Sequence, residues 1–196
     1  MQSTQTPTPK ASLSILEDLV VISVDLEGYR CLAQNVAIQA EVLPLSPAQD
    51  GVAAIAQMLV TLPQIRRLHL VTPNCLAGLR LGRVTLRYDN LPAHAQTLSQ
   101  WRSLLAPAAE VVIYNGEMAC TETGKLLIDV LHHLTGAAIA ACTAFPNAVF
   151  PSGRWEFDYA TLAPTPSLTL PLELVKQCLI TNQNCFENSP FAKISC

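Results

Sequence analysis

The stretch Leu19-Val-Val-Ile-Ser-Val24 is a continuous apolar run that is rich in β-branched residues. Such a run predicts a β-strand buried on both faces, as found in parallel sheets that are covered by helices. Two further strands are predicted at Glu41–Leu45 and Arg67–Val71, and the segment between them carries apolar residues at helical spacing. Asp50 is placed to cap that helix. A strand–helix–strand order of this kind predicts an α/β fold.

The rest of the chain continues this alternation. The further predicted elements are a hairpin at Leu79–Arg87 that turns at Gly82-Arg83, a helical region at Leu91–Leu105, a strand at Val111–Tyr114, a helix from Thr121 to Leu134 that stops at Gly136, a strand at Ala137–Cys142, an edge strand at Trp155–Asp158 and a short helix at Leu172–Leu179. Strands separated by helices of this length predict a mostly parallel sheet with helices on both faces, which is a three-layer sandwich.

A chain of 196 residues suits one domain. The polar, Pro/Thr-rich start predicts a loose segment at 1–13, and the Pro-rich composition after Ala163 predicts a linker and tail at 161–196. The α/β domain is therefore expected at 14–160.

Charge and hydropathy exclude several classes of partner. The formal net charge is -3, and the twelve basic residues are scattered, so the chain has no electrostatic footprint for nucleic acid. The start of the chain lacks the charged-then-apolar order of a signal peptide. No apolar run reaches the roughly 18 residues that a membrane span needs. We expect a soluble, cytoplasmic protein whose oligomeric state the sequence leaves open.

The seven cysteines, at positions 31, 75, 120, 142, 178, 185 and 196, form no CxxC pair and have no metal-ligand spacing with the four histidines. Neither a metal nor another cofactor is therefore predicted. An odd cysteine count without a signal peptide favours free thiols in a reducing compartment. Cys31 and Cys142 are expected in the core, since cysteine is among the most buried residue types. For the three tail cysteines a disulfide stays open.

Chemistry in such a sheet is expected just past the carboxyl ends of the strands. Those positions hold Asp25, Thr72-Pro73-Asn74 and Asn115-Gly116-Glu117, without a Gly-rich phosphate loop or a G-x-S-x-G elbow. Asp25 and Glu117 are candidates for a carboxylate pair, although solvated loop acids are the more usual arrangement. His69 is predicted to be a hydrogen-bonded core histidine, because it lies inside an apolar strand.

Several sequence anchors keep the order and spacing of a known family. They are Asp50-Gly51, Leu68-His-Leu-Val71, Leu79-Arg-Leu-Gly82, Leu91, Trp101, Val112-Ile-Tyr114, Gly124, Leu134-Thr-Gly136 and Gly153-Arg-Trp-Glu156. With these anchors the chain resembles the cyanobacterial domain of unknown function numbered 4347, from about Ile15 to Asp158. The resemblance implies a caspase-like (clan CD) α/β fold. Members of that family often belong to large surface or secreted proteins.

The family typically has Ser-His-Gly after the third strand and Tyr-Gly-Cys after the fourth, which by analogy with caspase-like peptidases would supply a His/Cys dyad. In this chain the motifs fall on Thr72-Pro73-Asn74 and Tyr114-Asn115-Gly116. Pro73 therefore replaces the histidine and Gly116 replaces the cysteine. The resemblance implies no catalytic residue here, and Pro73 and Gly116 are expected on neighbouring strand ends.

Three hypotheses follow from this departure. The first is a catalytically inactive, caspase-like domain that binds a protein or peptide, with Asp25, Asn74, Asn115 and Glu117 around the pocket between the strand ends. The second is a cysteine peptidase that uses the displaced thiol of Cys120, which lies near a predicted helix start. The third is a folded interaction surface without a pocket, expected if the cleft is filled by the protein's own side chains.

Overall fold

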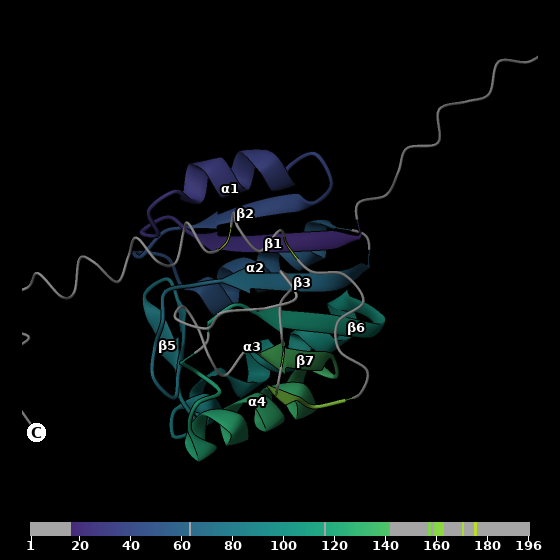
Figure 1. The fold of residues 1–196 in the computed structure, drawn as a ribbon. Helices are drawn as coiled ribbons and strands as arrows, with labels where there is room; N and C mark the ends of the chain where they lie inside the picture. The colour runs from purple at the N-terminus through teal and green to yellow at the C-terminus, as the bar shows by residue number, and fades with distance from the viewer. Residues whose placement is uncertain are drawn as a thin grey trace, which may run out of the picture.

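The computed structural model describes residues 17–62, 64–115, 117–141, 157, 159–162, 170 and 175. Among these residues six strands form one sheet, in the order β2 (Glu41–Leu45), β1 (Asp18–Ser23), β3 (Ile65–Val71), β6 (Leu105–Ile113), β7 (Ala138–Ala141) and β8 (Tyr159–Ala160). Neighbouring strands are parallel from β2 to β7, and β8 pairs with β7 in the antiparallel sense. The order from β2 to β7 can be followed in Figure 1.

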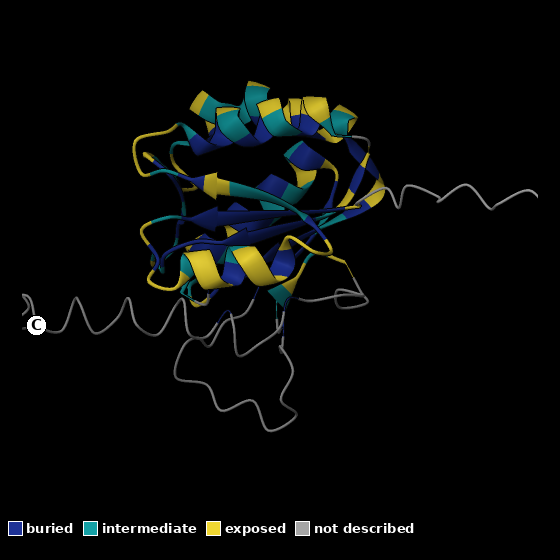
Figure 2. Ribbon diagram, turned by 90° about the horizontal axis from the view of Figure 1, so that it is seen from above, coloured by how far each residue is buried: buried dark blue, intermediate teal, exposed yellow. Residues whose placement is uncertain are grey.

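Helices cover both faces of the sheet, so the predicted α/β class is confirmed. Helices α2 (Gly51–Thr61), α3 (Leu91–Leu104) and α4 (Glu122–Thr135) pack on one face, here called the three-helix face. Helix α1 (Tyr29–Val36) packs on the other, the α1 face. Figure 2 shows the buried strands lying between these helical layers.

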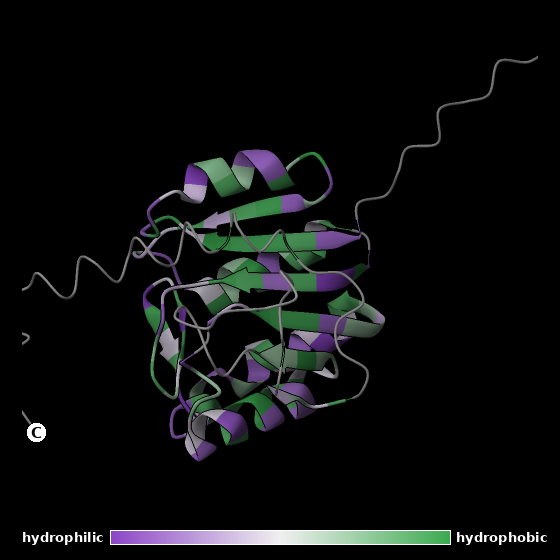
Figure 3. Ribbon diagram, in the orientation of Figure 1, coloured by the Kyte–Doolittle hydropathy of each residue, from purple (hydrophilic) through white to green (hydrophobic). Residues whose placement is uncertain are grey.

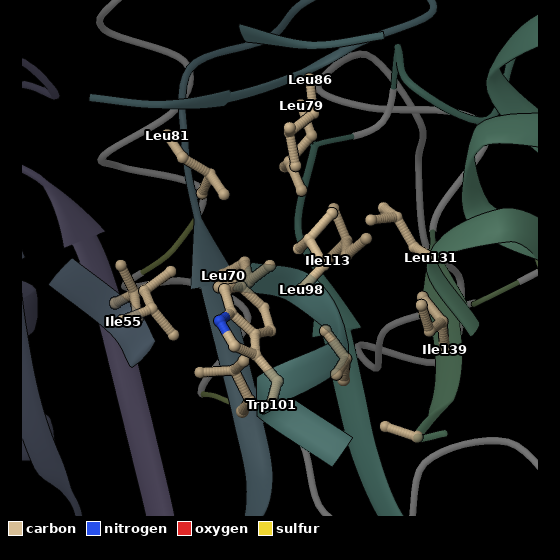
Figure 4. Close-up of a cluster of buried hydrophobic side chains, with 14 of the residues drawn as sticks. Ile55, Leu70, Leu79, Leu81, Leu86, Leu98, Trp101, Ile113, Leu131 and Ile139 are labelled. Atoms are coloured by element: carbon tan, nitrogen blue, oxygen red, sulfur yellow. The ribbon is translucent and has the colours of Figure 1, made fainter. Parts of the chain in front are cut away.

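Successive residues of each strand point to opposite faces of the sheet. In β3, Leu68 and Leu70 belong to the buried cluster of the three-helix face, whereas Val71 belongs to the cluster of the α1 face. Figure 4 shows side chains of the first cluster meeting from the strands, the helices and the hairpin. Figure 3 shows apolar residues along the strands and polar residues where several strands begin. Asp18, the first residue of β1, forms an ion pair with Arg67 of β3, with a distance of 2.6 Å between Oδ1 and Nε.

The predicted hairpin is present as β4 (Leu79–Leu81) and β5 (Val84–Leu86). It lies at the carboxyl end of the sheet (Figure 1). Its apolar side chains enter the core of the three-helix face. Gly82 makes the turn with φ +62, and a Cβ there would lie 2.3 Å from the carbonyl oxygen of Gln49. The adjacent Arg83 amide donates to the same carbonyl at 2.8 Å, so the hairpin is held against the loop that precedes α2.

Most predicted elements are confirmed, but three differ. Helix α1 was not predicted, because its eight residues bury only Leu32 and Val36 and no side chain caps its start. Strand β6 begins at Leu105 rather than at Val111. The edge strand expected at Trp155–Asp158 is not found at Phe157, the one described residue of that range. The strand β8 follows at Tyr159–Ala160.

The expectation that Cys31 lies in the core is wrong. Cys31 is exposed on α1, since the helix turns Leu32 and Val36 toward the sheet and leaves the preceding residue outside. Cys142 and the three tail cysteines lie outside the described residues. Cys75 is a free thiol.

The α1 face is completed by residues from far along the chain. Phe157, Leu170 and Val175 are buried in its cluster beside strand residues such as Val112 and Tyr114. Two of these residues come from the predicted linker and tail, 161–196, so this part of the chain contributes to the core. The segment 1–13, and the short helix expected at Leu172–Leu179 apart from Val175, lie outside the described residues. No helix in the described part of the chain has the length and hydropathy of a membrane span.

Candidate functional site

The ends of β3 and β6 lie side by side, as the motif positions require. The two strands are parallel neighbours with Leu70 opposite Ile113, and the Tyr114 amide donates to the carbonyl of Leu70 at 3.0 Å. Beyond the strands, the Asn115 side-chain amide donates to the carbonyl of Pro73 at 3.1 Å. Gly116 itself lies outside the described residues, so the expected neighbourhood is established as far as Asn115.

Asn115 is fully buried, and both ends of its side chain are used within the protein. Nδ2 donates to the carbonyls of Pro73 and Gly78, at 3.1 and 3.4 Å. Oδ1 accepts from the backbone N–H groups of Cys75 and Glu117, at 3.4 and 3.2 Å. An asparagine side chain offers two donors and one acceptor oxygen, so these bonds use its donors and both lone pairs. The side chain therefore fastens the loop after β3 to the turn after β6.

The residues after β3 are also largely enclosed. Thr72 and Pro73 are buried, and Asn74 is half-buried. The Thr72 hydroxyl oxygen and the Asn74 Oδ1 are both shielded from solvent and have no hydrogen-bond partner within the protein. Buried polar atoms of this kind are commonly satisfied by ordered water. The loop after β3 thus contains two buried oxygen atoms that have no protein partner. We call this loop and the turn after β6 the motif loops.

The two acids at the strand ends have separate surroundings. Asp25 pairs with Arg80 of the hairpin, with 3.3 Å between Oδ2 and Nη2. Glu117 is half-buried, and its backbone N–H is bound to Asn115. A carboxylate pair used in general acid–base chemistry needs two acids that share one site. The structure instead gives Asp25 a cationic partner from the hairpin.

The prediction that His69 is a hydrogen-bonded core residue is confirmed. Its side chain is 1% exposed, and Nδ1 lies 3.1 Å from the hydroxyl of Tyr114. The same hydroxyl accepts from the backbone N–H of Leu170 at 2.8 Å. Burial lowers the pKa of His69 to about 4, against an opposing effect of the nearby Asp18. Burial also raises the pKa of Tyr114, so both groups are neutral near pH 7.

The other histidines make local contacts on helices. Nδ1 of His132 lies 2.7 Å from the carbonyl of Ala137, and Nδ1 of His133 lies 2.8 Å from that of Asp129. His94 is half-buried on α3. Within the described residues, no three His, Cys, Asp or Glu side chains come together as a metal site would require.

Cys120 is exposed in the turn between β6 and α4. The next residue, Thr121, caps α4 by accepting from the Gly124 N–H at 3.1 Å. Gly124 fixes the turn against the helix, since a Cβ there would lie 1.6 Å from the carbonyl oxygen of Met118. His69, by contrast, is held inside the α1 face by Tyr114. A thiol nucleophile needs a base within hydrogen-bond reach.

The part played by Asn115 and Tyr114 was missed at the level of sequence. Both follow β6 directly, but their partners lie more than forty positions away along the chain, at Pro73, His69 and Leu170. The only available signal was the position of two polar residues after an apolar strand. That signal locates a strand end, but it does not distinguish a ligand-binding residue from a structural one.

The fold and the site together define a mostly parallel α/β domain whose motif loops are joined by buried side chains. The sequence profile described as "Domain of unknown function (DUF4347)" matches residues 19–177, and the chain belongs to that family. The matched span includes Leu170 and Val175, in agreement with their burial. No curated protein and no solved structure matches the chain.

Proposed function

We propose that this chain is a non-catalytic, caspase-like member of its family that acts as a protein-binding or scaffold module. The observation that carries the proposal is the buried Asn115 side chain. It reaches from the turn after β6 and donates to the carbonyls of Pro73 and Gly78 in the segment after β3. Those loops hold Pro73 and Gly116 at the positions that the resemblance assigns to a histidine and a cysteine. Neither residue can exchange a proton or attack a carbonyl through its side chain. The adjacency of β3 and β6 supports the caspase-like fold.

Binding is better supported on the surface beside the motif loops than in a cleft between them. Asn115 and Asp25, two of the expected rim residues, have internal partners. Two large apolar side chains next to the loops are exposed instead, Leu76 by 59% and Tyr88 by 47%. Arg87 joins their segments, since its Nη1 donates to the carbonyl of Leu76 at 3.1 Å. We call these three residues the Leu76–Tyr88 surface.

Aromatic and arginine side chains are enriched at protein interfaces, where they contribute much of the binding energy. The Leu76–Tyr88 surface has one of each, beside an exposed leucine. It therefore fits a protein or peptide partner with an apolar segment and an acidic group for Arg87. The free thiols of Cys31 and Cys75 are in keeping with a reducing compartment such as the cytoplasm.

Activity measurements separate this proposal from the cysteine-peptidase alternative. The full chain is incubated with a panel of fluorogenic peptides, beside Cys120→Ala and Cys75→Ala variants. We expect no turnover that depends on a thiol, because His69 is held inside the α1 face by Tyr114, and His132 and His133 contact backbone carbonyls at the end of α4. Turnover by the wild type that disappears in Cys120→Ala would overturn the proposal and establish the displaced-thiol peptidase.

Binding is measured by selecting peptides on the immobilised full chain from a displayed random library. We expect the selected peptides to lose affinity when Leu76→Ser and Tyr88→Ser are combined. Ile38→Ser is the matched control, because Ile38 is also exposed but follows α1, away from the hairpin. A selection that yields no binder, or binders that tolerate the double substitution, contradicts the assignment of this surface.

A further inference from the structure

An open surface cavity of about 420 Å³ lies at the end of the sheet where the strands begin, opposite the motif loops, and several of its lining residues are exposed. Its lining comes from Gln64 before β3, the first residues of β6, Ala137 before β7, and the ends of α3 and α4. Cavities of a few hundred Å³ are typical of small-molecule sites. This cavity shares no residue with the motif loops or with the Leu76–Tyr88 surface.

An irregularity in β6 shapes the cavity. Ile65 pairs with Leu105 and Arg67 pairs with Glu110, so residues 106–109 stand opposite the single residue Arg66. Within this bulge Ala108 has φ +58, and Gln64, the residue just before β3, has φ +21. Positive φ is unfavourable for residues with a side chain, and it persists where the surroundings hold it in place. The bulged backbone thus forms one wall of the cavity.

Arg102 is the one charged side chain among the described residues that line the cavity. Its Nη2 donates to the carbonyl of His133 at 2.9 Å, at the end of α4. Gly136 leaves room for this placement, because a Cβ there would lie 2.8 Å from Nε of Arg102. The ion pairs of the described residues involve other basic side chains, so Arg102 has no carboxylate partner among them. The exposed Arg102 side chain thus lines the cavity together with leucine, proline and alanine residues.

We propose that this cavity binds a small monocarboxylate with a short apolar body. The carboxylate pairs with the Arg102 guanidinium, whose fork of N–H donors matches a carboxylate in geometry and charge. The apolar body lies against Leu105, Pro107 and the alanines of the bulge. The last carbonyls of α3 and α4 bring partial negative charge to the same place, which opposes every anion and opposes a second negative charge more than the first.

Two-dimensional NMR titration of the full chain with hexanoate tests the proposal. We expect the amide resonances of Ala108, Ala109 and Gly136 to shift together with one saturation curve. Hexanamide, which has the same shape without the charge, is expected to bind about 10-fold more weakly, the effect of losing one charge-assisted hydrogen bond. Inorganic phosphate is the third probe, and we expect it to compete poorly because it lacks the apolar body.

Variants separate recognition by Arg102 from its structural role at the end of α4. Arg102→Gln is expected to weaken hexanoate binding about 10-fold or more, and the matched Arg30→Gln on α1 is expected to leave it unchanged. Thermal melting checks that Arg102→Gln is folded. If this variant does not fold, the comparison of hexanoate with hexanamide on the wild type still tests the proposal. Absence of shifts at the cavity, equal binding of the amide, or phosphate binding as tightly as hexanoate would overturn the proposal.

Discussion

Asn115 forms hydrogen bonds with both motif loops, because its side-chain amide can donate and accept at the same time. Nδ2 donates to two carbonyls, and Oδ1 accepts from two backbone N–H groups. An aspartate has nearly the same shape but no donor, so its carboxylate would face the carbonyls of Pro73 and Gly78. The difference between these two side chains provides a direct test of the arrangement.

We expect Asn115→Asp to lower the free energy of unfolding by about 3 kcal/mol at pH 7, because two buried carbonyls lose their donor and a buried charge faces them. The loss is expected to shrink at lower pH as the new carboxyl takes up a proton. Urea denaturation at pH 7 and pH 5 measures both effects. Asn90→Asp is the control, since Asn90 makes similar bonds to Thr85 and Arg87 in a half-exposed turn. A loss no larger than the control's would show that Asn115 does not fasten the loops.

His69 gives the protein a dependence on acid. Its pKa is about 4 in the folded chain and near the ordinary 6.5 when unfolded, so the unfolded chain binds the proton first as the pH falls. The protonation of His69 therefore leaves the free energy of unfolding unchanged above pH 6.5. Between pH 6.5 and pH 4 it lowers that free energy by at most about 3 kcal/mol. Denaturation at a series of pH values should show a shallower decline for His69→Phe than for the wild type. Equal slopes in the two proteins would exclude His69 as the cause.

Among the elements, β6 departs most from its neighbours. Four of its residues stand opposite Arg66, and Ala108 within this bulge has φ +58. Glycine adopts such a conformation without steric cost, although it also loses more conformational entropy on folding. The two effects oppose each other, and for a residue already at positive φ the relief of strain is the larger.

Ala108→Gly is therefore expected to raise the free energy of unfolding by up to about 1 kcal/mol. Ala93→Gly, at an exposed position in the first turn of α3, serves as the control and is expected to lower the free energy of unfolding by less than the roughly 1 kcal/mol of a helix interior. Thermal and urea denaturation of both variants measures the contrast. If both substitutions lower the free energy of unfolding, alanine at position 108 has no backbone strain that glycine relieves, and the prediction is wrong.

The elements that could be predicted from the sequence are those with a long apolar pattern. Strand β1 and helix α2 are such cases, and the cap of α2 at Asp50 is confirmed by its bond to the Ala53 N–H at 3.1 Å. The start of β6 escaped prediction because Pro107 and its alanines have no strand pattern. Cys31 was misplaced because composition alone does not tell which side of a short helix meets the sheet.

The candidate site was predictable only in part for a similar reason. The alternation of strands and helices was enough to place the motif residues at one end of the sheet, and the structure brings Pro73 and Asn115 together there. The use of each side chain depends on contacts between segments distant in the sequence. Asn115 and Asp25 were considered for a pocket rim, and their partners Gly78 and Arg80 come from the segment around the hairpin.

At the scale of the whole molecule, the α1 face depends on residues beyond 160. Helix α1 contributes only Leu32 and Val36 as buried residues, and Leu170 and Val175 are buried in the same cluster. The Leu170 N–H also donates to the Tyr114 hydroxyl. Part of the segment expected to be a linker thus takes part in the packing of the sheet.

A chain that ends at residue 162 is therefore expected to be less stable than one that ends at residue 177. Removal of the buried side chains of Leu170 and Val175 should lower the free energy of unfolding by about 4 kcal/mol, roughly 2 kcal/mol for each. Thermal melting measures the loss, and binding of a hydrophobic dye reports the uncovered sheet. Equal melting temperatures for the two chains would mean that the contacts of Leu170 and Val175 add nothing to stability.

The outer strands of the sheet bear on how this molecule meets others. An outer strand with a long row of unpaired backbone groups invites a strand from another chain, which is a common route to aggregation. Here β2 is five residues long and contains Pro44, which has no N–H, and β8 is only two residues long. Neither border described in the structure is a good template for continuing the sheet. Addition of a strand from a second copy is therefore disfavoured at both of these strands.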